Sequence, residues 1–275
     1  MRKKSTIVAL VIVLLLVTVT TAGAITWGEP TTDYPYVGTL LFEQTSGLYS
    51  CTGTLLSPTV MLTAGHCTEE FGEPNFRTWV SFDPQITFEG ASAYPDLFAY
   101  LDAEWIQGQA IPHPQFDDFA MWPNTYDVGV VILDSAVELD EYGTLPELGL
   151  LDALTKGRGR KDREFTAVGY GVQGVLPPFE MDDWARYKGT VSLIEVKSAF
   201  TGDGQGAKFT NNPGKGNGSG GTCFGDSGGP VFHGDSNVVG AVVSWGITPC
   251  IGVDYQFRMD TAVAQDFVIP FLLAP

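Results

Sequence analysis

Basic residues are scarce in this sequence. Lysine and arginine together number 15 against 32 aspartates and glutamates, which gives a formal net charge of −17. Negative charge of this size repels the phosphate groups of nucleic acids and anionic lipids, so we expect neither as a partner. We interpret the acidic surface mainly as a means of keeping the chain in solution, with attraction of basic substrates as the functional alternative.

Long apolar runs are lacking as well. The run Ile7–Val17 is short for a membrane span; it follows basic residues at positions 2–4 and precedes Ala22-Gly23-Ala24. This order predicts a secretory signal peptide over residues 1–24, with a membrane anchor as the alternative. Its removal takes away three basic residues and no acidic ones, leaving 251 residues with 12 basic and 32 acidic side chains, a net charge of −20. We therefore expect a secreted or extracytoplasmic protein that begins at Ile25.

Cysteine and histidine are rare, and neither follows a metal-binding spacing. There are four cysteines and three histidines, with no C-x-x-C or H-x-x-x-H pattern, so a zinc site is the weaker interpretation. An even number of cysteines in an exported chain predicts two disulfides, for which three connectivities exist. Short sequence separations favour Cys51 with Cys67 and Cys223 with Cys250.

Helical patterns are few, whereas short β-branched or aromatic segments bounded by turn residues are many. Such segments predict an all-β sandwich or barrel architecture, either one large unit or two small barrels. They cover residues 36–42, 60–64, 128–133, 165–171, 189–196, 229–232 and 238–246.

Two further segments have their own pattern. Near the C-terminus, Asp260 is expected to cap a helix over residues 261–269, which Pro270 would end. The Gly- and Asn-rich stretch Thr201–Gly221 is low in apolar residues and predicts a long loop.

Three short motifs carry side chains suited to chemistry. His66 ends the apolar segment "LTAGHC", Asp127 opens the apolar strand "VGVVIL", and Ser227 lies in "GDSGGP". A serine hydroxyl needs a neighbouring base to become a nucleophile, histidine can accept its proton at neutral pH, and a buried aspartate can orient that histidine. Asp117, Asp118 and Asp134 are alternatives to Asp127, but none of them immediately precedes the strand.

The glycines around Ser227 also fit acyl chemistry. Two backbone N–H groups aimed at one point stabilise the oxyanion of a tetrahedral intermediate, and side-chain bulk would obstruct the substrate. Gly225 and Ser227 are placed to supply the two N–H groups, and Gly228 and Gly229 permit backbone angles that a Cβ would forbid.

Taken in order, "LTAGHC", an aspartate opening an apolar strand, "GDSGGP" and "SWG" resemble the trypsin/chymotrypsin family of serine proteases, as a bacterial-type secreted member. The resemblance implies two six-stranded antiparallel β-barrels with the active site in the cleft between them. It assigns an N-terminal segment and the first barrel, with His66 and Asp127, to residues 25–147. The second barrel, with Ser227, and a C-terminal helix then occupy residues 148–275.

Individual roles follow from the resemblance, residue by residue. It makes His66 the general base, Asp127 its orienting partner and Ser227 the nucleophile, with Gly225 and Ser227 as the oxyanion hole. It pairs the cysteines as favoured above. The expected substrate-binding residues are Gly221, Thr222, Ser244, Trp245, Gly246 and Gly252, of which Ser244 to Gly246 pair with the substrate backbone.

Asp226 has a separate implied role. In the family, the matching aspartate forms an ion pair with a newly made N-terminal amine, and Ile25-Thr26-Trp27-Gly28 resembles the family's start, with Trp27 as a departure. No basic activation site precedes Ile25. We therefore hypothesise that signal peptidase itself creates the activating N-terminus.

The specificity pocket is expected to be uncharged. Gly221 stands at the pocket floor, where a carboxylate would select arginine or lysine, so apolar or aromatic residues are favoured. Asp254 lies in a segment that lines the pocket and keeps a preference for basic residues as the alternative.

No cofactor is expected. The acidic turn with Glu69, Glu70 and Glu73 resembles a calcium loop of some relatives, but solvated carboxylates are the simpler interpretation. Expected partners are polypeptide substrates and protein protease inhibitors, with the chain as a monomer. The rival to an endopeptidase is a catalytically silent binding module on the same fold. An esterase on an α/β-hydrolase fold is disfavoured because no aspartate-then-histidine order follows Ser227.

Overall fold

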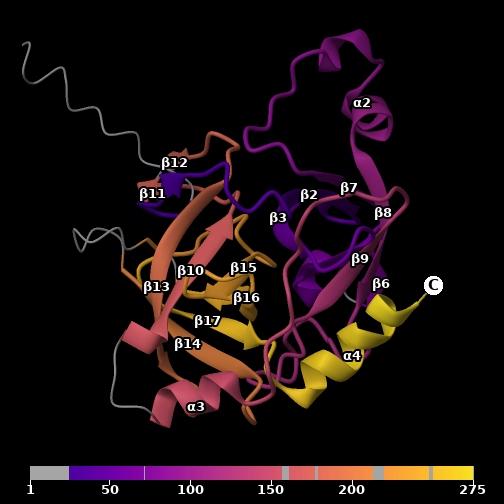
Figure 1. The fold of residues 1–275 in the computed structure, drawn as a ribbon. Coiled ribbons are helices and arrows are strands. Elements are labelled where there is room, and N and C mark those ends of the chain that lie inside the picture. Colours follow the sequence, from indigo (N-terminus) through magenta and orange to yellow (C-terminus); the bar gives the residue numbers. More distant parts are fainter. Residues whose placement is uncertain are drawn as a thin grey trace, which may run out of the picture.

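The computed structural model describes residues 25–70, 72–156, 161–176, 179–212, 220–247 and 250–274, and the expected signal peptide lies outside these ranges. Within them, two antiparallel β-barrels stand side by side (Figure 1). The first barrel closes in the order β2-β3-β4-β9-β8-β7. Its strands are β2 (Val37–Gln44), β3 (Gly47–Leu55), β4 (Val60–Thr63), β7 (Arg77–Ser81), β8 (Ile106–Pro112) and β9 (Gly129–Leu133).

The second barrel is built from the later part of the chain. Its strands run in the order β13-β10-β15-β16-β17-β14, and a pairing of β13 with β14 closes it. The expected fold of two six-stranded barrels is thereby confirmed. The strands are β10 (Glu164–Gly169), β13 (Tyr187–Glu195), β14 (Gly206–Asn211), β15 (Pro230–His233), β16 (Val239–Gly246) and β17 (Gly252–Arg258).

Among the described residues, five short strands lie outside the two six-stranded barrels. The strand β1 (Glu29–Pro30) pairs with β13, so the N-terminal segment joins the second barrel. Two small ribbons pair β5 (Glu69–Glu70) with β6 (Glu73–Pro74), and β11 (Gly174–Leu176) with β12 (Phe179–Met181).

The barrels form where side chains alternate between core and solvent. In β13, Tyr187, Gly189, Val191 and Leu193 are buried, and the residues that alternate with them are partly exposed. This period of two directs one face of each strand inward, which is how a small barrel fills its interior.

The loop expected over Thr201–Gly221 contains a strand, so that prediction is wrong in its middle. Residues Gly206–Asn211 form β14. Its side chains alternate between partly exposed and buried positions, and Ala207 and Phe209 are buried. The glycines around this short amphipathic strand favoured the prediction of a loop. The strand forms because it pairs with β13 and β17, which local sequence patterns do not reveal.

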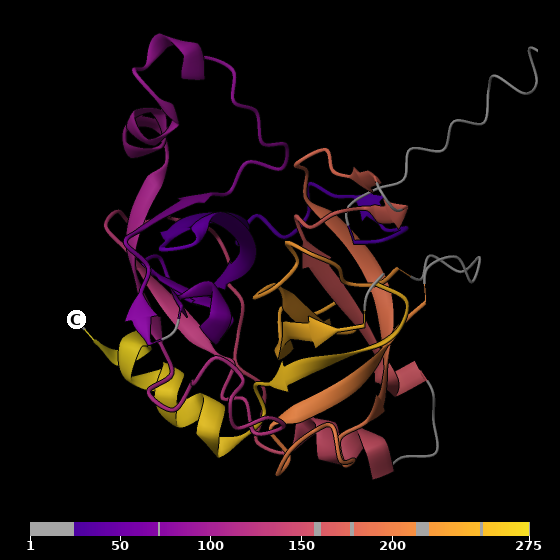
Figure 2. The same cartoon turned by 180° about the vertical axis from the view of Figure 1, so that it is seen from behind.

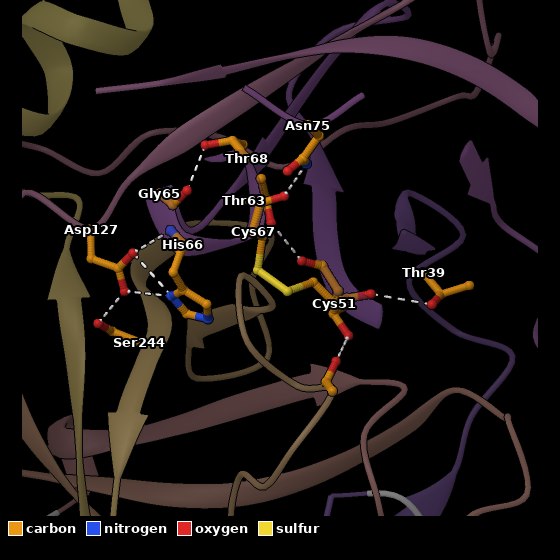
Figure 3. The surroundings of a disulfide bond; sticks show 12 residues. Thr39, Cys51, Thr63, Gly65, His66, Cys67, Thr68, Asn75, Asp127 and Ser244 are labelled. Atoms are coloured by element: carbon orange, nitrogen blue, oxygen red, sulfur yellow. Dashed lines mark hydrogen bonds and ion pairs between the residues drawn. A yellow bond between two sulfur atoms is a disulfide. The ribbon is translucent and has the colours of Figure 1, made fainter. Parts of the chain in front are cut away.

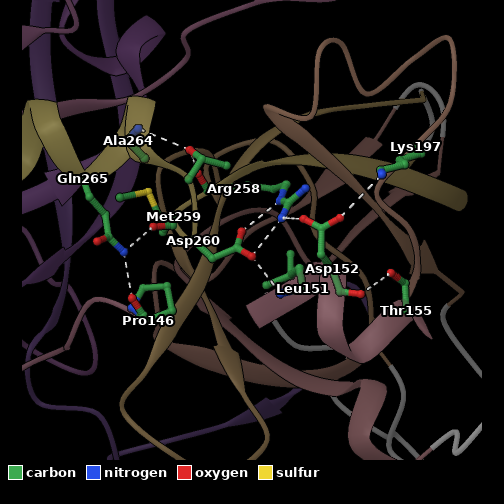
Figure 4. Close-up of polar contacts among 11 residues, drawn as sticks. Pro146, Leu151, Asp152, Thr155, Lys197, Arg258, Met259, Asp260, Ala264 and Gln265 are labelled. Atoms are coloured by element: carbon green, nitrogen blue, oxygen red, sulfur yellow. Dashed lines mark hydrogen bonds and ion pairs between the residues drawn. The ribbon is translucent and has the colours of Figure 1, made fainter. Parts of the chain in front are cut away.

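The C-terminal helix exists, but both of its expected ends are wrong. Helix α4 spans Ala262–Leu273, and its cap is Thr261, whose Oγ1 accepts a hydrogen bond from the Ala264 N–H. Pro270 lies inside the helix, because a proline near the last turn forfeits only one intrahelical bond. Asp260 instead accepts a hydrogen bond from the Leu151 N–H and pairs with Arg258 (Figure 4).

Two further helices were not anticipated from the sequence. Helix α2 (Leu97–Glu104) begins at Asp96, whose carboxylate accepts a hydrogen bond from the Ala99 N–H, and α3 (Leu150–Lys156) is anchored through Arg258 and Asp152. Three 3₁₀ turns complete the described elements: η1 (Gly65–Cys67), η2 (Ala91–Ala93) and η3 (Lys161–Arg163).

The first and last described elements each pack on the barrel that is formed by the other half of the chain. Helix α4 lies along the first barrel, in whose core cluster Ala264 and Val268 are buried (Figure 2). Because β1 adds to the second barrel and α4 packs on the first, each barrel is covered by a segment from the opposite end of the chain.

Candidate active site

Strand pairing in the first barrel brings His66 and Asp127 together. Strands β4 and β9 run antiparallel with Thr63 opposite Gly129. The chain turns through η1 just after β4, and Asp127 lies two residues before β9 begins. Residues beyond one strand and before its antiparallel partner lie at the same barrel end, which places the two side chains side by side.

The contact between them has several hydrogen bonds (Figure 3). The His66 backbone N–H donates to Asp127 Oδ1 at 2.9 Å, and His66 Nδ1 lies 3.1 Å from Oδ1 and 3.0 Å from Oδ2. Ser244 Oγ donates to Oδ2, and the Asp127 side chain is fully buried. Four interactions therefore fix the carboxylate and the orientation of the imidazole ring.

Burial and charge act in opposite directions on this pair. Burial raises the pKa of Asp127, but the His66 charge and the hydrogen bonds from His66 and Ser244 outweigh it, so the pKa is lowered. Burial lowers the pKa of His66, but the charge and hydrogen bond of Asp127 outweigh it, so this pKa is raised. The arrangement can hold a proton on imidazole more firmly than an isolated histidine does.

Ser227 reaches the same place from the second barrel. Its carbonyl accepts a hydrogen bond from the Thr52 N–H at 2.8 Å, and Thr52 Oγ1 donates to the Gly225 carbonyl at 2.8 Å. Thr52 belongs to β3, so the first barrel holds the serine turn of the second. His66 and Ser227 both line one pocket of about 450 Å³, here called the Trp245 pocket.

Glycine is required at two positions of the serine turn. Gly225 and Gly228 have φ angles of 91° and 79°, in the left-handed region. A Cβ on Gly228 would stand 2.0 Å from Thr63 Oγ1 and 2.4 Å from the Thr52 carbonyl oxygen. The turn can therefore pack directly on the first barrel only without a side chain at Gly228.

Two backbone donors of this turn are unused. Neither the Gly225 N–H nor the Ser227 N–H donates a hydrogen bond within the ranges that the structure describes, whereas the Gly228 and Gly229 N–H groups are both bonded. Buried donors normally find acceptors, so an unused pair beside a hydroxyl can receive an oxygen from a bound molecule.

Both expected disulfides are present. Cys51 is bonded to Cys67 with a Cα–Cα distance of 6.2 Å, and Cys223 to Cys250 with 5.3 Å. The first joins β3 to η1, next to His66 (Figure 3). The second borders the Trp245 pocket, which both of its cysteines line.

The structure brings together four of the six expected substrate-binding residues. Thr222, Ser244, Trp245 and Gly246 line the Trp245 pocket. Gly221 and Gly252 do not line it: Gly221 is bridged to Thr26, and Gly252 pairs with Asn211 in β17.

Several lining residues have no signal in the sequence. Asn211 lines the pocket at the end of β14 and donates from Nδ2 to the Thr222 carbonyl at 2.8 Å. Its buried Oδ1 has no partner among the residues that the structure describes. Asn211 lies in the segment predicted to be a long loop, and its sequence context does not indicate a role in the pocket. The remaining lining residues that the sequence did not indicate as part of the pocket are Asp118, Phe119, Phe224 and Ile247.

Asp254 is buried beneath the pocket wall. It is 1% exposed, accepts a hydrogen bond from Thr222 Oγ1 on Oδ2, and has no partner for Oδ1 within the described residues. Burial is the largest cause of a pKa raised to about 7, against the hydrogen bonds from Thr222 and Gln256. The carboxyl group can therefore change its charge near neutral pH.

Comparison of this chain with known proteins shows its family. The family model described as Trypsin matches residues 25–268. The chain belongs to the trypsin family. A vitellin-degrading protease of Bombyx mori is 24% identical over 226 residues, covering 78% of this chain and 72% of the relative. Kallikrein 1-related peptidase b3 of Mus musculus is 27% identical over 220 residues, covering 74% and 72%.

A solved structure supports the fold of this trypsin-family chain. The structure described as HL collagenase aligns with a TM-score of 0.64 at 18% identity, covering 92% of this chain and 99% of that one. Both relatives named above come from animals, so they do not support the bacterial-type assignment, which stays a prediction.

Trypsin-family serine proteases need no cofactor. Within the part of the chain that the structure describes, the single group of three or more potential metal ligands is Cys51, His66 and Cys67, whose cysteines are joined in a disulfide. The acidic turn of Glu69, Glu70 and Glu73 forms no such group. No helix of the described residues is long and apolar enough to cross a membrane.

The N-terminal segment of this family member docks beside the serine turn. Ile25 is fully buried, and Thr26 exchanges two backbone hydrogen bonds with Gly221. Asp226 is also fully buried; its Oδ1 accepts the Gly171 N–H and its Oδ2 the Cys223 N–H, both at 2.8 Å. Burial is the main cause of the rise in its pKa to about 7, against those hydrogen bonds. Among the described residues, Asp226 has no ion-pair partner.

Proposed function

We propose that this chain is a secreted serine endopeptidase in which Ser227 is the nucleophile, His66 the general base and Asp127 its orienting partner. The observation that carries the proposal is the fixed imidazole: Asp127 binds Nδ1, so Nε2 is the nitrogen left for the pocket that His66 shares with Ser227. This is the division of roles that serine acyl transfer requires.

Each step then has a group to perform it. Ser227 Oγ attacks the peptide carbonyl and passes its proton to His66 Nε2, while the Gly225 and Ser227 N–H groups bind the oxyanion. His66 gives that proton to the leaving amine, the C–N bond breaks, and an ester to Ser227 remains. Water, deprotonated by His66, attacks the ester and releases the carboxylic acid and the free serine.

The edge of β16 supports binding of an extended peptide. Pairing of β16 with β15 ends at Val242 and Pro230, and the bonds of Val243 go to the serine turn. Ser244 to Gly246 continue along β17 on one side only, so their other edge can pair with a substrate strand. This places the substrate backbone beside Ser227.

We propose a preference for apolar or aromatic residues on the acyl side of the cleaved bond. Support comes from the Trp245 pocket, whose lining includes Val243, Trp245 and Ile247, with Asp118 as the single acidic residue among the described lining residues. Asp254 keeps basic residues as the second candidate, because its buried carboxyl is bonded to Thr222 of that pocket through Oδ2 and its Oδ1 has no partner among the described residues.

Replacing Asp254 by asparagine separates these two preferences. We expect kcat/KM for a peptide with phenylalanine before the cleaved bond to stay within about twofold, because an isosteric amide keeps the Thr222 contact. The measurement compares phenylalanine and arginine peptides in both proteins. A large loss on phenylalanine would contradict the pocket assignment, and a large loss on arginine alone would favour basic substrates.

We further propose that residues 1–24 direct export and that cleavage after Ala24 yields the working enzyme. The sequence order of basic head, apolar run and small residues supports this. Polypeptide substrates and protein inhibitors follow from family membership.

The proposal is tested by intact mass of the exported protein before and after a fluorophosphonate probe, with Ser227→Ala alongside. We expect one adduct on a chain that begins at Ile25 and none on Ser227→Ala. A folded chain that begins at Ile25 and takes no adduct would instead support the silent binding module. An unreactive chain with another start would indicate a precursor that awaits a second protease.

A further inference from the structure

A second depression adjoins Ser227 and is acidic. It has a volume of about 740 Å³ and shares His66 and Ser227 with the Trp245 pocket; here it is called the β5 cleft. Its lining includes four acidic residues and no lysine or arginine: Glu69, Glu70, Asp118 and Asp182. Only Asp118 among them also lines the Trp245 pocket.

The β5 cleft lies on the leaving-group side of the bond to be cleaved. The free edge of Ser244 to Gly246, where the acyl part of a substrate would pair, belongs to the Trp245 pocket. The β5 cleft is instead lined by Cys51, Gly225 and His66, and His66 is the group that would protonate the departing amine. Residues after the cleaved bond therefore enter the β5 cleft.

Glu69 is the unusual member of this wall. Its side chain is 8% exposed and lines the cleft, yet its carboxylate forms no hydrogen bond or ion pair with any described residue. Burial raises its pKa, and the charge of Asp118 raises it further. A largely buried residue whose carboxylate faces the cleft without a described partner, next to a second negative charge, is an arrangement that a bound cation would relieve.

The local structure holds Glu69 in place. Gln44 Nε2 donates to the Glu69 carbonyl at 3.1 Å and to Asn75 Oδ1 at 3.0 Å. Asn75 Nδ2 donates in turn to the Cys67 carbonyl at 2.8 Å (Figure 3). The β5–β6 ribbon is thus tied to the disulfide beside His66. The backbone of Glu69 is therefore anchored close to the reacting atoms.

Glu70 adds charge beside it. The Ser46 N–H and hydroxyl both donate to the Glu70 carboxylate, and no cation is paired with it among the described residues. The nearby guanidinium of Arg77 is already paired with Glu43 at 2.7 Å. The cleft therefore presents negative charge to whatever enters it.

A metal ion is a poorer fit than a substrate side chain. The acidic residues of the cleft do not form a group of three or more ligands within the described residues. Calcium requires six to eight oxygens converging on one point. Carboxylates spread along a wall suit ammonium or guanidinium groups on an extended peptide.

We propose that the β5 cleft selects lysine or arginine at the first or second position after the cleaved bond, with Glu69 as the main counter-ion. This inference rests on the proposed acyl-enzyme mechanism and names the substrate class of its leaving-group side. It is independent of the residue preferred in the Trp245 pocket.

The test partitions the acyl-enzyme among added amines. The enzyme is acylated with the p-nitrophenyl ester of an N-acylated phenylalanine, and water competes with lysine amide, norleucine amide, alanyl-lysine amide or alanyl-norleucine amide. The amine nitrogen attacks the ester carbonyl, an amide bond forms, the ester bond breaks and Ser227 regains its proton. The ratio of amide to acid product measures binding in the β5 cleft alone.

We expect a lysine amide to be captured about tenfold better than its norleucine counterpart, the effect of one charge-assisted hydrogen bond. Glu69→Gln should reduce this preference to about twofold. Glu73→Gln is the matched control, because Glu73 pairs with Glu70 in the same ribbon but does not line the cleft, and it should keep the preference.

Every outcome bears on the inference. Equal capture of lysine and norleucine amides by the unaltered enzyme would overturn it whether or not a variant folds, while leaving the acyl-enzyme mechanism intact. A preference that survives Glu69→Gln, or is lost equally in Glu73→Gln, would also overturn it. Failure of the ester to acylate Ser227 would remove both the proposed function and this inference.

Discussion

Replacing Asp127 by asparagine is expected to lower kcat by about four orders of magnitude, the effect seen when a triad aspartate loses its charge. In this chain the loss has a direct cause. The Asp127 carboxylate accepts hydrogen bonds from the His66 backbone N–H and from the His66 ring at Nδ1. The asparagine amide would offer one acceptor and one donor group in place of these two acceptor oxygens. The imidazole would then take the tautomer with its proton on Nε2, which cannot accept from Ser227.

The same substitution should shift the pH profile. The acidic limb of kcat/KM follows deprotonation of His66, whose pKa is raised by Asp127 against the lowering effect of burial. Removing the aspartate charge lowers the pKa of His66, so the acidic limb should move to lower pH while the plateau falls. A limb that moves to higher pH would contradict this electrostatic assignment.

The control lies at the other end of the same strand. Asp134 follows β9 directly and is exposed, so Asp134→Asn should leave kcat within about twofold. Steady-state kinetics on one peptide substrate, with circular dichroism to confirm folding, measures both variants. A loss below about tenfold in Asp127→Asn would remove Asp127 from its proposed role.

Retaining Ala24 at the N-terminus is expected to reduce kcat/KM by about 10²- to 10³-fold, the effect of leaving a buried charge without its partner. Asp226 is fully buried beside Ser227 with a pKa of about 7, and no described residue pairs with it. A free ammonium on Ile25 would supply the charge. An amide nitrogen at the same position would not.

The pH dependence of this ion pair has a defined sign. A carboxylate partner raises the pKa of an α-amine above its usual value near ~8, so the pair is complete below that value and is lost as pH rises through the raised pKa. Activity should therefore fall on the alkaline side in the chain that begins at Ile25.

The matched control for the N-terminus is Ile25→Val at the same start, which keeps the amine and a β-branched apolar side chain for the buried position. It should retain kcat/KM within a few-fold, because an Ile→Val change deletes one buried methyl. Mass spectrometry confirms each start. Full activity with Ala24 retained would contradict the activation hypothesis.

Much of the fold could be read locally. Apolar alternation and turn residues indicated the strands, because each strand must bury one face whatever its neighbours are. Helix ends were less accessible: Thr261 and Asp260 are both good caps, and Arg258 and the Leu151 N–H compete for Asp260. That competition involves residues on β17 and α3, which local rules do not see.

The sequence by itself indicated the candidate catalytic residues, favoured the disulfide pairing and suggested the family, because short motifs combine particular side chains at predicted strand ends and turns. Only the tertiary structure decided which residues surround them and how deeply they are buried. Asn211 joined the Trp245 pocket, Asp254 was buried beneath it, and Glu69 came to line the β5 cleft. Burial and the nearness of distant charges arise only when two barrels pack, and they set the pKa values and the selectivity of a cleft.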